Sequence, residues 1–241
     1  MNVVGIIPSR IASTRLANKP LIEIDGHPLI AHVICRAKAS KILKDIYVAT
    51  DSEDIANVAI KYGAIPIMTD SNISNGTERV AVANEEINAD IVVHINGDEV
   101  LLSPKDIDLL IESMTDVVLE QPGILYRKTT EFNDQSIFKV LVNKNNDVFC
   151  LTRSDIPSNA RGNVEYMYAA YFVTIYHKEH LSKYINSEVS MLEEKESCNE
   201  MRFIEMGINY KGVFTDTFSL SIDVPSDLIK LESMSFLNDY L

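Results

Sequence analysis

The chain has 241 residues, 46% hydrophobic and 24% charged, a balance typical of a soluble domain with a sizeable core. Its formal net charge of −13 argues against nonspecific nucleic-acid binding, which needs a basic face, but not against small anionic substrates. Three separated cysteines indicate neither a disulfide framework nor a zinc site. With no visible secretory signal and no apolar run of about 18 residues, we expect a cytoplasmic protein that does not insert into membranes.

The first half of the chain predicts alternating strands and helices. Periodicity and capping residues predict strands at 3–7, 45–50, 65–68, 91–95 and 116–119, and helices at 28–39, 52–62, 74–88 and 104–114. A turn at Asp25-Gly26 follows the first loop. This alternation predicts the α/β class, with a mostly parallel sheet sandwiched by helices.

The pattern changes near residue 121. We expect a hairpin of strands at 136–142 and 148–151, then a strand at 166–176, a helical region at 188–205, a last strand at 218–222 and a helix from 225 to about 241. The whole chain, 1–241, is predicted to be one domain. Within it, about 121–185 are expected to form a small antiparallel lobe for substrate binding or dimerisation.

A polar loop follows the first predicted strand and carries three cations, Arg10, Arg15 and Lys19, with no carboxylate before Glu23. Arginine offers a planar fork to phosphate oxygens and lysine a mobile point charge. Loops at the carboxyl ends of parallel strands are where open α/β sheets bind ligands. The loop therefore predicts a phosphate pocket, and three ordinary surface cations on a solvated loop are the alternative.

Two aspartates occupy similar places, because Asp98 follows the strand at 91–95 and Asp223 follows the strand at 218–222. If both strands join one sheet, the two carboxylates can converge where the first loop enters. Such a pair suits Mg²⁺, which usually takes one or two carboxylates plus substrate phosphates. The alternative is that each aspartate caps a helix or forms a turn.

Four segments resemble motifs of the CMP-KDO synthetases, the 3-deoxy-manno-octulosonate cytidylyltransferases. Residues 7–21, IPSRIASTRLANKPL, resemble the opening motif of that family, and 75–79, NGTER, resemble its base-recognition turn. Residues 96–99 and 221–228 resemble the motifs whose aspartates hold the catalytic magnesium. The resemblance implies a nucleotide-diphospho-sugar transferase-like fold, a homodimer, and transfer of CMP from CTP to the anomeric hydroxyl of a 2-keto-3-deoxy sugar acid.

The same resemblance implies roles for individual residues. Catalysis would fall to Arg10, Arg15, Lys19, Asp98 and Asp223, with Mg²⁺ held by Asp98 and Asp223, and Glu99 would be a supporting or second-metal residue. Nucleotide binding would fall to residues of the first loop and the base-recognition turn, namely Pro8, Arg10, Ala12, Ser13, Thr14, Arg15, Lys19, Asn75, Gly76 and Arg79. Sugar binding would fall to Asn96, Lys139, Arg153, Met167, Tyr171, Asn199 and Glu200.

The match to the family is weakest on the sugar side. Met167 stands where the family has histidine, Asn199 where it has glutamate, Glu200 where it has glutamine, and Asn96 where it has another glutamine. A polar pocket discriminates strongly, so these changes predict either a modified octulosonate, such as an amino sugar, or neutral drift with KDO still bound. The new carboxylate of Glu200 would suit a substrate ammonium.

Two other functions remain open from the sequence. One is a nucleotidyltransferase of the same fold that uses another sugar or nucleotide. The other is a noncatalytic homologue that binds a sugar nucleotide, against which the retained Lys19, Asp98 and Asp223 argue.

Overall fold

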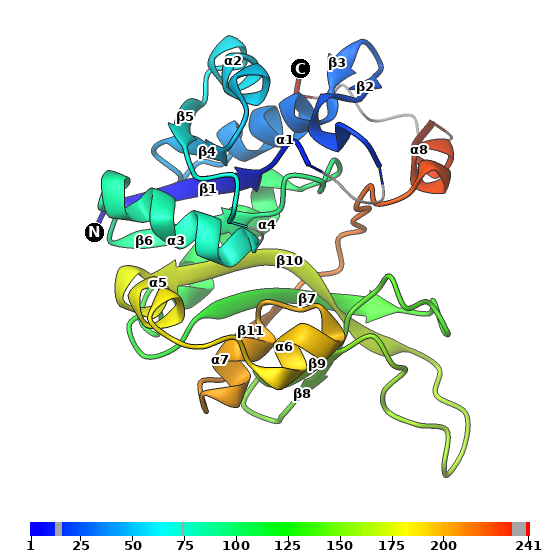
Figure 1. Cartoon of the computed structure of the whole chain (residues 1–241). Helices are drawn as coiled ribbons and strands as arrows, with labels where there is room; N and C mark the ends of the chain where they lie inside the picture. Colours follow the sequence, from blue (N-terminus) through cyan, green and yellow to red (C-terminus); the bar gives the residue numbers. More distant parts are fainter. Residues whose placement is uncertain (13–15, 74, 233–239) are drawn as a thin grey trace.

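The computed structural model describes residues 1–12, 16–73, 75–232 and 240–241. Across these residues, nine strands form one sheet in the order β5-β4-β1-β6-β10-β7-β11-β9-β8, with helices on both faces (Figure 1). A separate two-stranded ribbon, β2 (Glu23–Ile24) and β3 (His27–Pro28), contains the predicted turn at Asp25-Gly26. Within the described ranges, no helix has the length and apolar character needed to cross a bilayer.

The N-terminal half of the sheet is parallel, as predicted. Its four strands are β5 (Ile65–Met68), β4 (Ile46–Thr50), β1 (Val3–Ser9) and β6 (Ile91–Ile95). The central strand β1 pairs Gly5 with Ile46 on one side and with Val93 on the other. Since all four strands run the same way, the segments after β1 and β6 leave the sheet at the same edge.

The prediction of a mostly parallel sheet is wrong for the second half, and the sheet is mixed. β10 (Met167–His177) runs antiparallel to both β6 and β7 (Gly123–Thr129), whereas β11 (Tyr210–Phe214) is parallel to β7. The predicted hairpin is present as β8 (Lys139–Val142) and β9 (Asp147–Thr152), and β9 pairs with β11. The strands of residues 121–185 thus continue the main sheet and do not form a separate sheet.

The helices form two layers, each with its own core cluster. One face carries α1 (Leu29–Lys38), α2 (Glu53–Lys61), α4 (Pro104–Met114) and, through Leu231, α8 (Pro225–Glu232). The other carries α3 (Gly76–Ile87), α5 (Lys178–Ile185), α6 (Met191–Glu196) and α7 (Met201–Glu205). Apolar residues at helical spacing build both layers, because a helix buries one stripe against the sheet.

Two predicted strands are wrong and two strands and a helix were not predicted. Residues 116–119 form turns that follow α4, where Val118 is buried and its N–H bonds to the Met114 carbonyl. Residues 218–222 are extended but make only an isolated bridge, between Ser221 and Glu99. Among the elements of five or more residues, those without a prediction are β7, β11 and α5. The C-terminal helix is described as α8 to Glu232, and the rest of its predicted span, 233–239, lies outside the described residues.

Candidate active site

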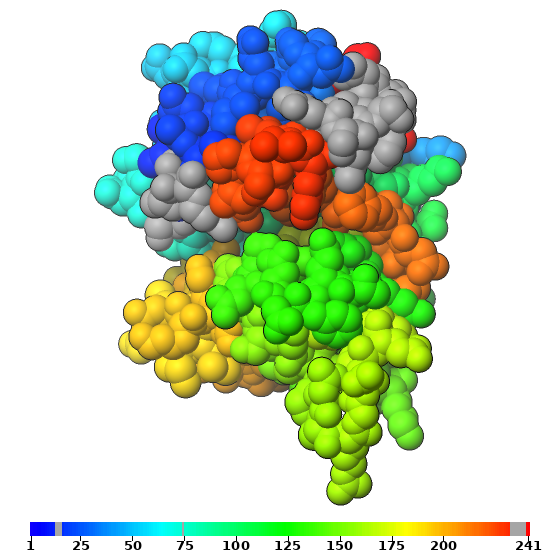
Figure 2. Space-filling model, turned by 90° about the vertical axis from the view of Figure 1, so that its right-hand side faces the viewer, coloured from blue at the N-terminus to red at the C-terminus, as the bar shows by residue number. Residues whose placement is uncertain are grey.

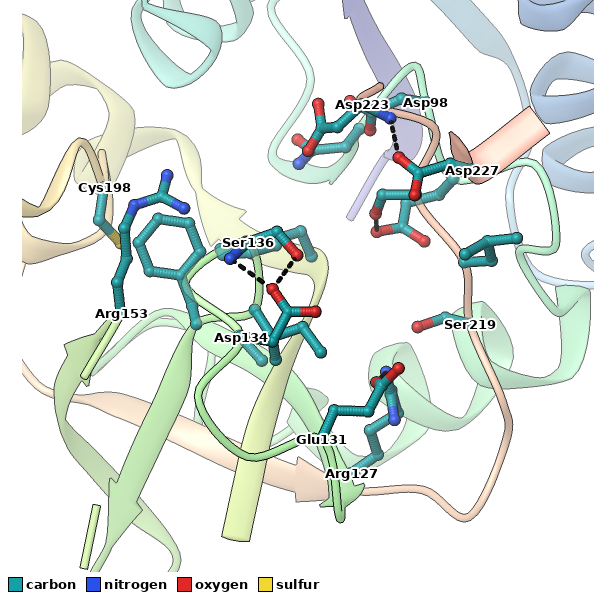
Figure 3. A pocket seen from close by; sticks show the side chains of 18 of the residues that line it. Asp98, Arg127, Glu131, Asp134, Ser136, Arg153, Cys198, Ser219, Asp223 and Asp227 are labelled. Atoms are coloured by element: carbon teal, nitrogen blue, oxygen red, sulfur yellow. Dashed lines mark hydrogen bonds and ion pairs between the residues drawn. The ribbon is translucent and has the colours of Figure 1, made fainter. Parts of the chain in front are cut away.

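A pocket of about 490 Å³ lies between the two halves of the molecule. In Figure 2, α8 (orange-red) lies directly above a green segment, and residues of both line the pocket, including Lys230 from α8 and Glu131 from the segment after β7. Figure 3 shows Asp98 and Asp223 at one end and Arg127 and Glu131 at the other. The pocket therefore brings the two acidic sequence motifs together with residues far from them in the chain.

The pocket lining is predominantly acidic. Among the described residues, its carboxylates are Asp98, Glu99, Glu131, Asp134, Glu200, Asp223 and Asp227, against the cations Arg127, Arg153 and Lys230. Two of these cations contact other lining residues: Lys230 lies 4.0 Å from Glu131, and the Arg153 guanidinium covers the Phe138 ring at 3.9 Å. A ligand that brings its own cation, or a positively charged group, is favoured by such a lining.

Two backbone contacts place Asp223 beside Asp98. After β11, the hydroxyls of Thr215 and Thr217 donate to Asp106 near the start of α4. The chain then passes the loop after β6, where Ile222 N–H donates to the Asp98 carbonyl at 3.1 Å and Ser221 bridges to Glu99. The strand predicted at 218–222 is thus absent. Residues 221–222, here called the clasp, are held by these two contacts and place Asp223 beside Asp98, as predicted.

Lys19 lies between these two aspartates. Its Nζ donates to Asp98 Oδ2 at 2.6 Å and to Asp223 Oδ1 at 2.9 Å, and the lysine side chain is only 14% exposed. Burial lowers the pKa of Lys19, but the charges of both aspartates and their hydrogen bonds outweigh that effect, so the pKa lies above its usual value. The cationic loop and both acidic motifs therefore meet at one point.

The two aspartates fit a magnesium ion. Asp98 Oδ1 is buried and has no hydrogen-bond partner among the described residues, so it is free to accept a cation. The described residues contain no group of three or more histidines, cysteines and carboxylates arranged as a metal site. Mg²⁺ needs no such cage, because substrate phosphates and water complete its oxygen shell. The Asp98–Asp223 pair therefore matches a magnesium site that is completed only when the nucleotide binds.

Glu99, next to Asp98 in the chain, is bonded to the segment that leads to Asp223. Its carboxylate accepts a hydrogen bond from Ser221 Oγ at 2.5 Å. Burial and the neighbouring Asp98 charge raise the pKa of Glu99 to about 7. Of the two roles that the sequence left open for Glu99, the supporting one matches this geometry, because Glu99 holds the segment that carries Asp223.

The turn at 75–79 and the loop after β6 both come close to Pro8, near the end of β1. A Cβ at Gly76 would lie 3.6 Å from Pro8 Cγ, and a Cβ at Gly97 would lie 3.1 Å from the Pro8 carbonyl oxygen. Gly97 thus permits a close approach that a side chain would crowd. Arg10 and Ala12 are exposed beyond Pro8. The predictions for Ser13, Thr14 and Arg15 concern positions outside the described residues.

Arg79 holds the base-recognition turn in place. The residue is 2% exposed, and its guanidinium donates to the Thr69 hydroxyl and to the Ile73 carbonyl. Asp51 lies 3.7 Å away, and its other oxygen accepts the Ile11 N–H at 3.0 Å. Arg79 thus anchors the turn and links it to the loop after β1, and its predicted contact with the nucleotide stays a prediction.

The predicted sugar-binding residues divide into two groups. Asn96, Arg153, Asn199 and Glu200 line the pocket. The other three, Lys139, Met167 and Tyr171, are not among the lining residues, so their contact with the sugar stays a prediction. Lys139 is fully buried 3.2 Å from Asp155, Met167 is buried, and the Tyr171 hydroxyl accepts the Ser103 N–H at 3.1 Å. All three are engaged in packing or internal bonds.

Several pocket residues were not predicted from the sequence. They come mainly from the unpredicted strand β7 and from the segments that flank the clasp, and include Arg127, Glu131, Ser136, Phe218, Asp227 and Lys230. Asp227 is well defined, because one oxygen accepts the N–H groups of Asp223 and Val224 at 2.8 and 2.9 Å. An acidic residue at the third position of a helix, as Asp227 is in α8, is the signal that indicates such a contact.

Comparison with known proteins agrees with this geometry. A family model described as cytidylyltransferase matches residues 4–212. A 3-deoxy-manno-octulosonate cytidylyltransferase of Chloroherpeton thalassium is 31% identical, over 97% of this chain and 98% of its own. The chain belongs to the 3-deoxy-manno-octulosonate cytidylyltransferase family. Membership makes it a nucleotidyltransferase of the cytidylyltransferase type.

Two further relatives bear on the fold and the substrate. The solved structure of a CMP:2-keto-3-deoxy-manno-octonic acid synthetase complexed with CTP has a TM-score of 0.90 and 29% identity, covering 97% of this chain and 98% of its own. It confirms the expected nucleotide-diphospho-sugar transferase-like fold. An 8-amino-3,8-dideoxy-manno-octulosonate cytidylyltransferase of Shewanella halifaxensis is 29% identical over 95% of this chain and 96% of its own. Cytidylyltransferases of this kind thus include enzymes named for an amino sugar.

Proposed function

We propose that the chain transfers CMP from CTP to the anomeric hydroxyl of a 3-deoxy-octulosonate, for lipopolysaccharide or another surface glycan. The anomeric oxygen attacks the α-phosphorus in line, the bond from that phosphorus to the β-phosphate oxygen breaks, and pyrophosphate leaves. Such a transfer is served mainly by positioning and by neutralising charge. The observation that carries the proposal is the meeting of Lys19, Asp98 and Asp223 at the end of one pocket.

Each part of the site has a role in this reaction. The Lys19 ammonium and the Arg10 and Arg15 guanidinium groups bind the triphosphate. Asp98 and Asp223 hold Mg²⁺, which neutralises phosphate charge when it is bound. The turn at 75–79 receives the base beside Pro8, and the pocket receives the sugar acid. Arg153 and Arg127 are the pocket cations that can meet the sugar carboxylate.

A panel of substrates tests this function. Release of pyrophosphate is measured from CTP, UTP and dTTP with KDO, 8-amino-KDO and sugar 1-phosphates, each with and without Mg²⁺. Turnover confined to CTP with an octulosonate supports the proposal. Turnover with another nucleotide or with a sugar 1-phosphate would show a related transferase instead, and no turnover anywhere would indicate a noncatalytic homologue.

Gly76→Ala tests the base-recognition turn. Next to Pro8 at 3.6 Å and the His94 ring at 3.7 Å, a methyl group at this position makes ordinary contacts with the described residues. We therefore expect an unchanged melting temperature, but CTP binding weakened at least about tenfold, because the methyl fills space that the base would use. Calorimetry with CTP and thermal unfolding measure the two effects. A lower melting temperature with unchanged CTP affinity would show that Gly76 serves packing alone.

Glu200 favours an amino sugar as the acceptor. The carboxylate lines the pocket and is 5% exposed, with Cys198 Sγ as a hydrogen-bond neighbour at 3.4 Å. Burial raises the pKa of Glu200, and a substrate ammonium beside it would stabilise the ionised form. The predominantly acidic lining supports the same acceptor. KDO itself remains the other candidate, since Asn96 and Asn199 serve either sugar.

Glu200→Gln separates these two sugars. We expect the ratio of kcat/KM for 8-amino-KDO to that for KDO to fall at least about tenfold, because the amide keeps the shape and loses the charge. The control is Glu194→Gln on α6, which removes the same charge from a side chain that is 68% exposed. An unchanged ratio in the Glu200 variant would remove this residue from sugar recognition.

The homodimer that the family resemblance implies is also proposed for this chain, in the cytoplasm where CTP is made. Light scattering on the purified protein measures the molar mass, and a value near 54 kDa, twice the 27.0 kDa of the chain, is the expected result.

A further inference from the structure

A buried polar network connects the base-recognition turn to the pocket. Asn75 Nδ2 donates to the Tyr184 hydroxyl at 2.6 Å and to Glu193 Oε1 at 2.9 Å. Arg202 grips the same carboxylate with two hydrogen bonds, Nε to Oε2 at 2.6 Å and Nη2 to Oε1 at 2.7 Å. Glu193, Arg202 and Tyr184 are at most 5% exposed. Charge-assisted bonds of this kind are strong inside a protein and costly to break.

The network spans four helices. Asn75 caps α3, where its Oδ1 accepts the Glu78 N–H at 3.0 Å, so the same amide serves both the cap and the network. Tyr184 belongs to α5, Glu193 to α6 and Arg202 to α7. Figure 1 shows α5, α6 and α7 on one side of the sheet, and α3 packs against α5.

The pocket segment Ser197–Glu200 lies between the two charged partners. Glu193 stands four residues before this segment and Arg202 two residues after it, and all four of its residues line the pocket. The Tyr184 hydroxyl lies 3.0 Å from Glu193 Oε1 and 3.4 Å from the Asn199 carbonyl, so it adds a direct link. The Glu193–Arg202 ion pair therefore connects the two ends of this segment. Asn75 bonds to the same pair and so links the segment to the turn at 75–79.

We propose that Asn75 is a positioning residue for the sugar acid, which holds the pocket segment Ser197–Glu200 at a fixed distance from the base-recognition turn through Glu193 and Arg202. The proposal rests on the proposed function and assigns Asn75 a role other than base contact. It explains why asparagine stands here. A serine would keep the cap through its hydroxyl, but has no amide to reach both Tyr184 and Glu193.

The departures from the family motifs on the two sides of the site are linked by this network. Asn75 stands where the base-recognition turn that residues 75–79 resemble has serine, and Asn199 and Glu200 are changed residues of the sugar side. The Tyr184 hydroxyl joins Asn75 to the backbone carbonyl of Asn199, the residue before Glu200. A change at the turn therefore acts on the pocket segment, because buried networks are satisfied as a whole.

Asn75→Ser is the principal test. We expect KM for the octulosonate to rise about tenfold, since the variant loses two hydrogen bonds, one of them to a buried carboxylate, while the Kd for CTP changes less than about threefold. Hydrogen exchange gives a readout that is independent of turnover. Backbone amides of residues 197–200 are expected to exchange faster in the variant, while those of α4 are unchanged.

Two further variants make the test specific. Asn84→Ala removes a buried amide from the other end of α3, where it bonds the Ala89 N–H at 3.1 Å and the Ala89 carbonyl at 3.2 Å. It reports the effect of weakening α3 away from the pocket, and the sugar KM should stay at the wild-type value. Since removing Glu193 would leave Arg202 buried without its partner, Arg202→Lys is the second network variant, and should raise the sugar KM in the same direction.

The outcomes separate this proposal from the proposed function. An Asn75→Ser variant with wild-type sugar KM and wild-type exchange at residues 197–200 would overturn the positioning role, as would weaker CTP binding with an unchanged sugar side. If Asn84→Ala raised the sugar KM by the same factor, the effect of Asn75→Ser would come from the general stability of α3 and the positioning role would be overturned. A wild-type protein without turnover on the substrate panel would refute the proposed function, and the exchange measurement would still decide whether Asn75 orders the pocket segment.

Discussion

Lys19→Met is expected to lower kcat at least about tenfold, or about 1.4 kcal/mol, because it removes the cation nearest to the phosphate-binding end of the pocket. In the same variant, binding of Mg²⁺ or Mn²⁺ without nucleotide is expected to tighten. The Lys19 ammonium now neutralises Asp98 and Asp223 at 2.6 and 2.9 Å, and its loss leaves two adjacent carboxylates that repel each other. A divalent ion relieves that repulsion.

Two measurements check the result. Pyrophosphate release gives kcat, and calorimetric titration with Mg²⁺ or Mn²⁺ gives the affinity of the nucleotide-free protein. The matched control is Lys178→Met, because Lys178 also pairs with an aspartate, Asp90 at 3.2 Å, but follows β10 at the far end of the sheet. Wild-type kcat and wild-type metal affinity in the Lys19 variant would exclude this residue from the mechanism.

Asp98→Asn is expected to abolish magnesium-dependent turnover, with a loss of at least about a hundredfold, or about 2.7 kcal/mol. The amide keeps the shape of the side chain but not its charge, and it cannot replace a carboxylate ligand for a hard cation. The fold is expected to persist, because the backbone carbonyl that accepts the Ile222 N–H at 3.1 Å is unchanged and the asparagine oxygen can still accept a hydrogen bond from Lys19.

The Asp98 variant is compared with Asp90→Asn, which removes a carboxylate from the Lys178 pair. Circular dichroism and thermal unfolding establish that both variants fold, and activity is measured over a range of Mg²⁺ concentrations. Activity of the Asp98 variant that still rises with Mg²⁺ to the wild-type maximum would show that the ion binds elsewhere. Partial recovery only at high Mg²⁺ would instead fit a site that has lost one of its two charges.

Local patterns were sufficient to predict the N-terminal half of the fold. Strands such as β1 and β6 are continuous apolar runs bounded by polar segments, and each is buried on both faces, which is the composition of parallel strands in a layered domain. The hairpin of β8 and β9 was also predictable, from a turn-forming tetrapeptide between two β-rich segments. The direction and order of the later strands could not be predicted in this way, because β10 pairs with β6 and β7 through contacts between residues far apart in the chain.

The residues predicted to bind the sugar show that a motif match does not tell which face of a strand a side chain occupies. Strand β10 alternates its side chains, so Ala170 and Phe172 line the pocket while Met167 and Tyr171 are buried away from it. The same alternation places Lys139 in the interior, whereas its neighbour Phe138 lines the pocket. A shift of one residue exchanges the two faces of a strand, and a motif match without the register does not decide between them.

The antiparallel pairing of β10 with β6 also limits how the enzyme can move. Five consecutive residue pairs, from Val173–Ile95 to His177–Ile91, join the two halves into one hydrogen-bonded surface. Opening the halves like a clamshell would break that ladder, which is more costly than bending a linker between independent lobes. We therefore expect substrates to enter and leave past the segments that border the pocket outside the sheet, such as α8 and the clasp before it, without a hinge between the two halves of the sheet.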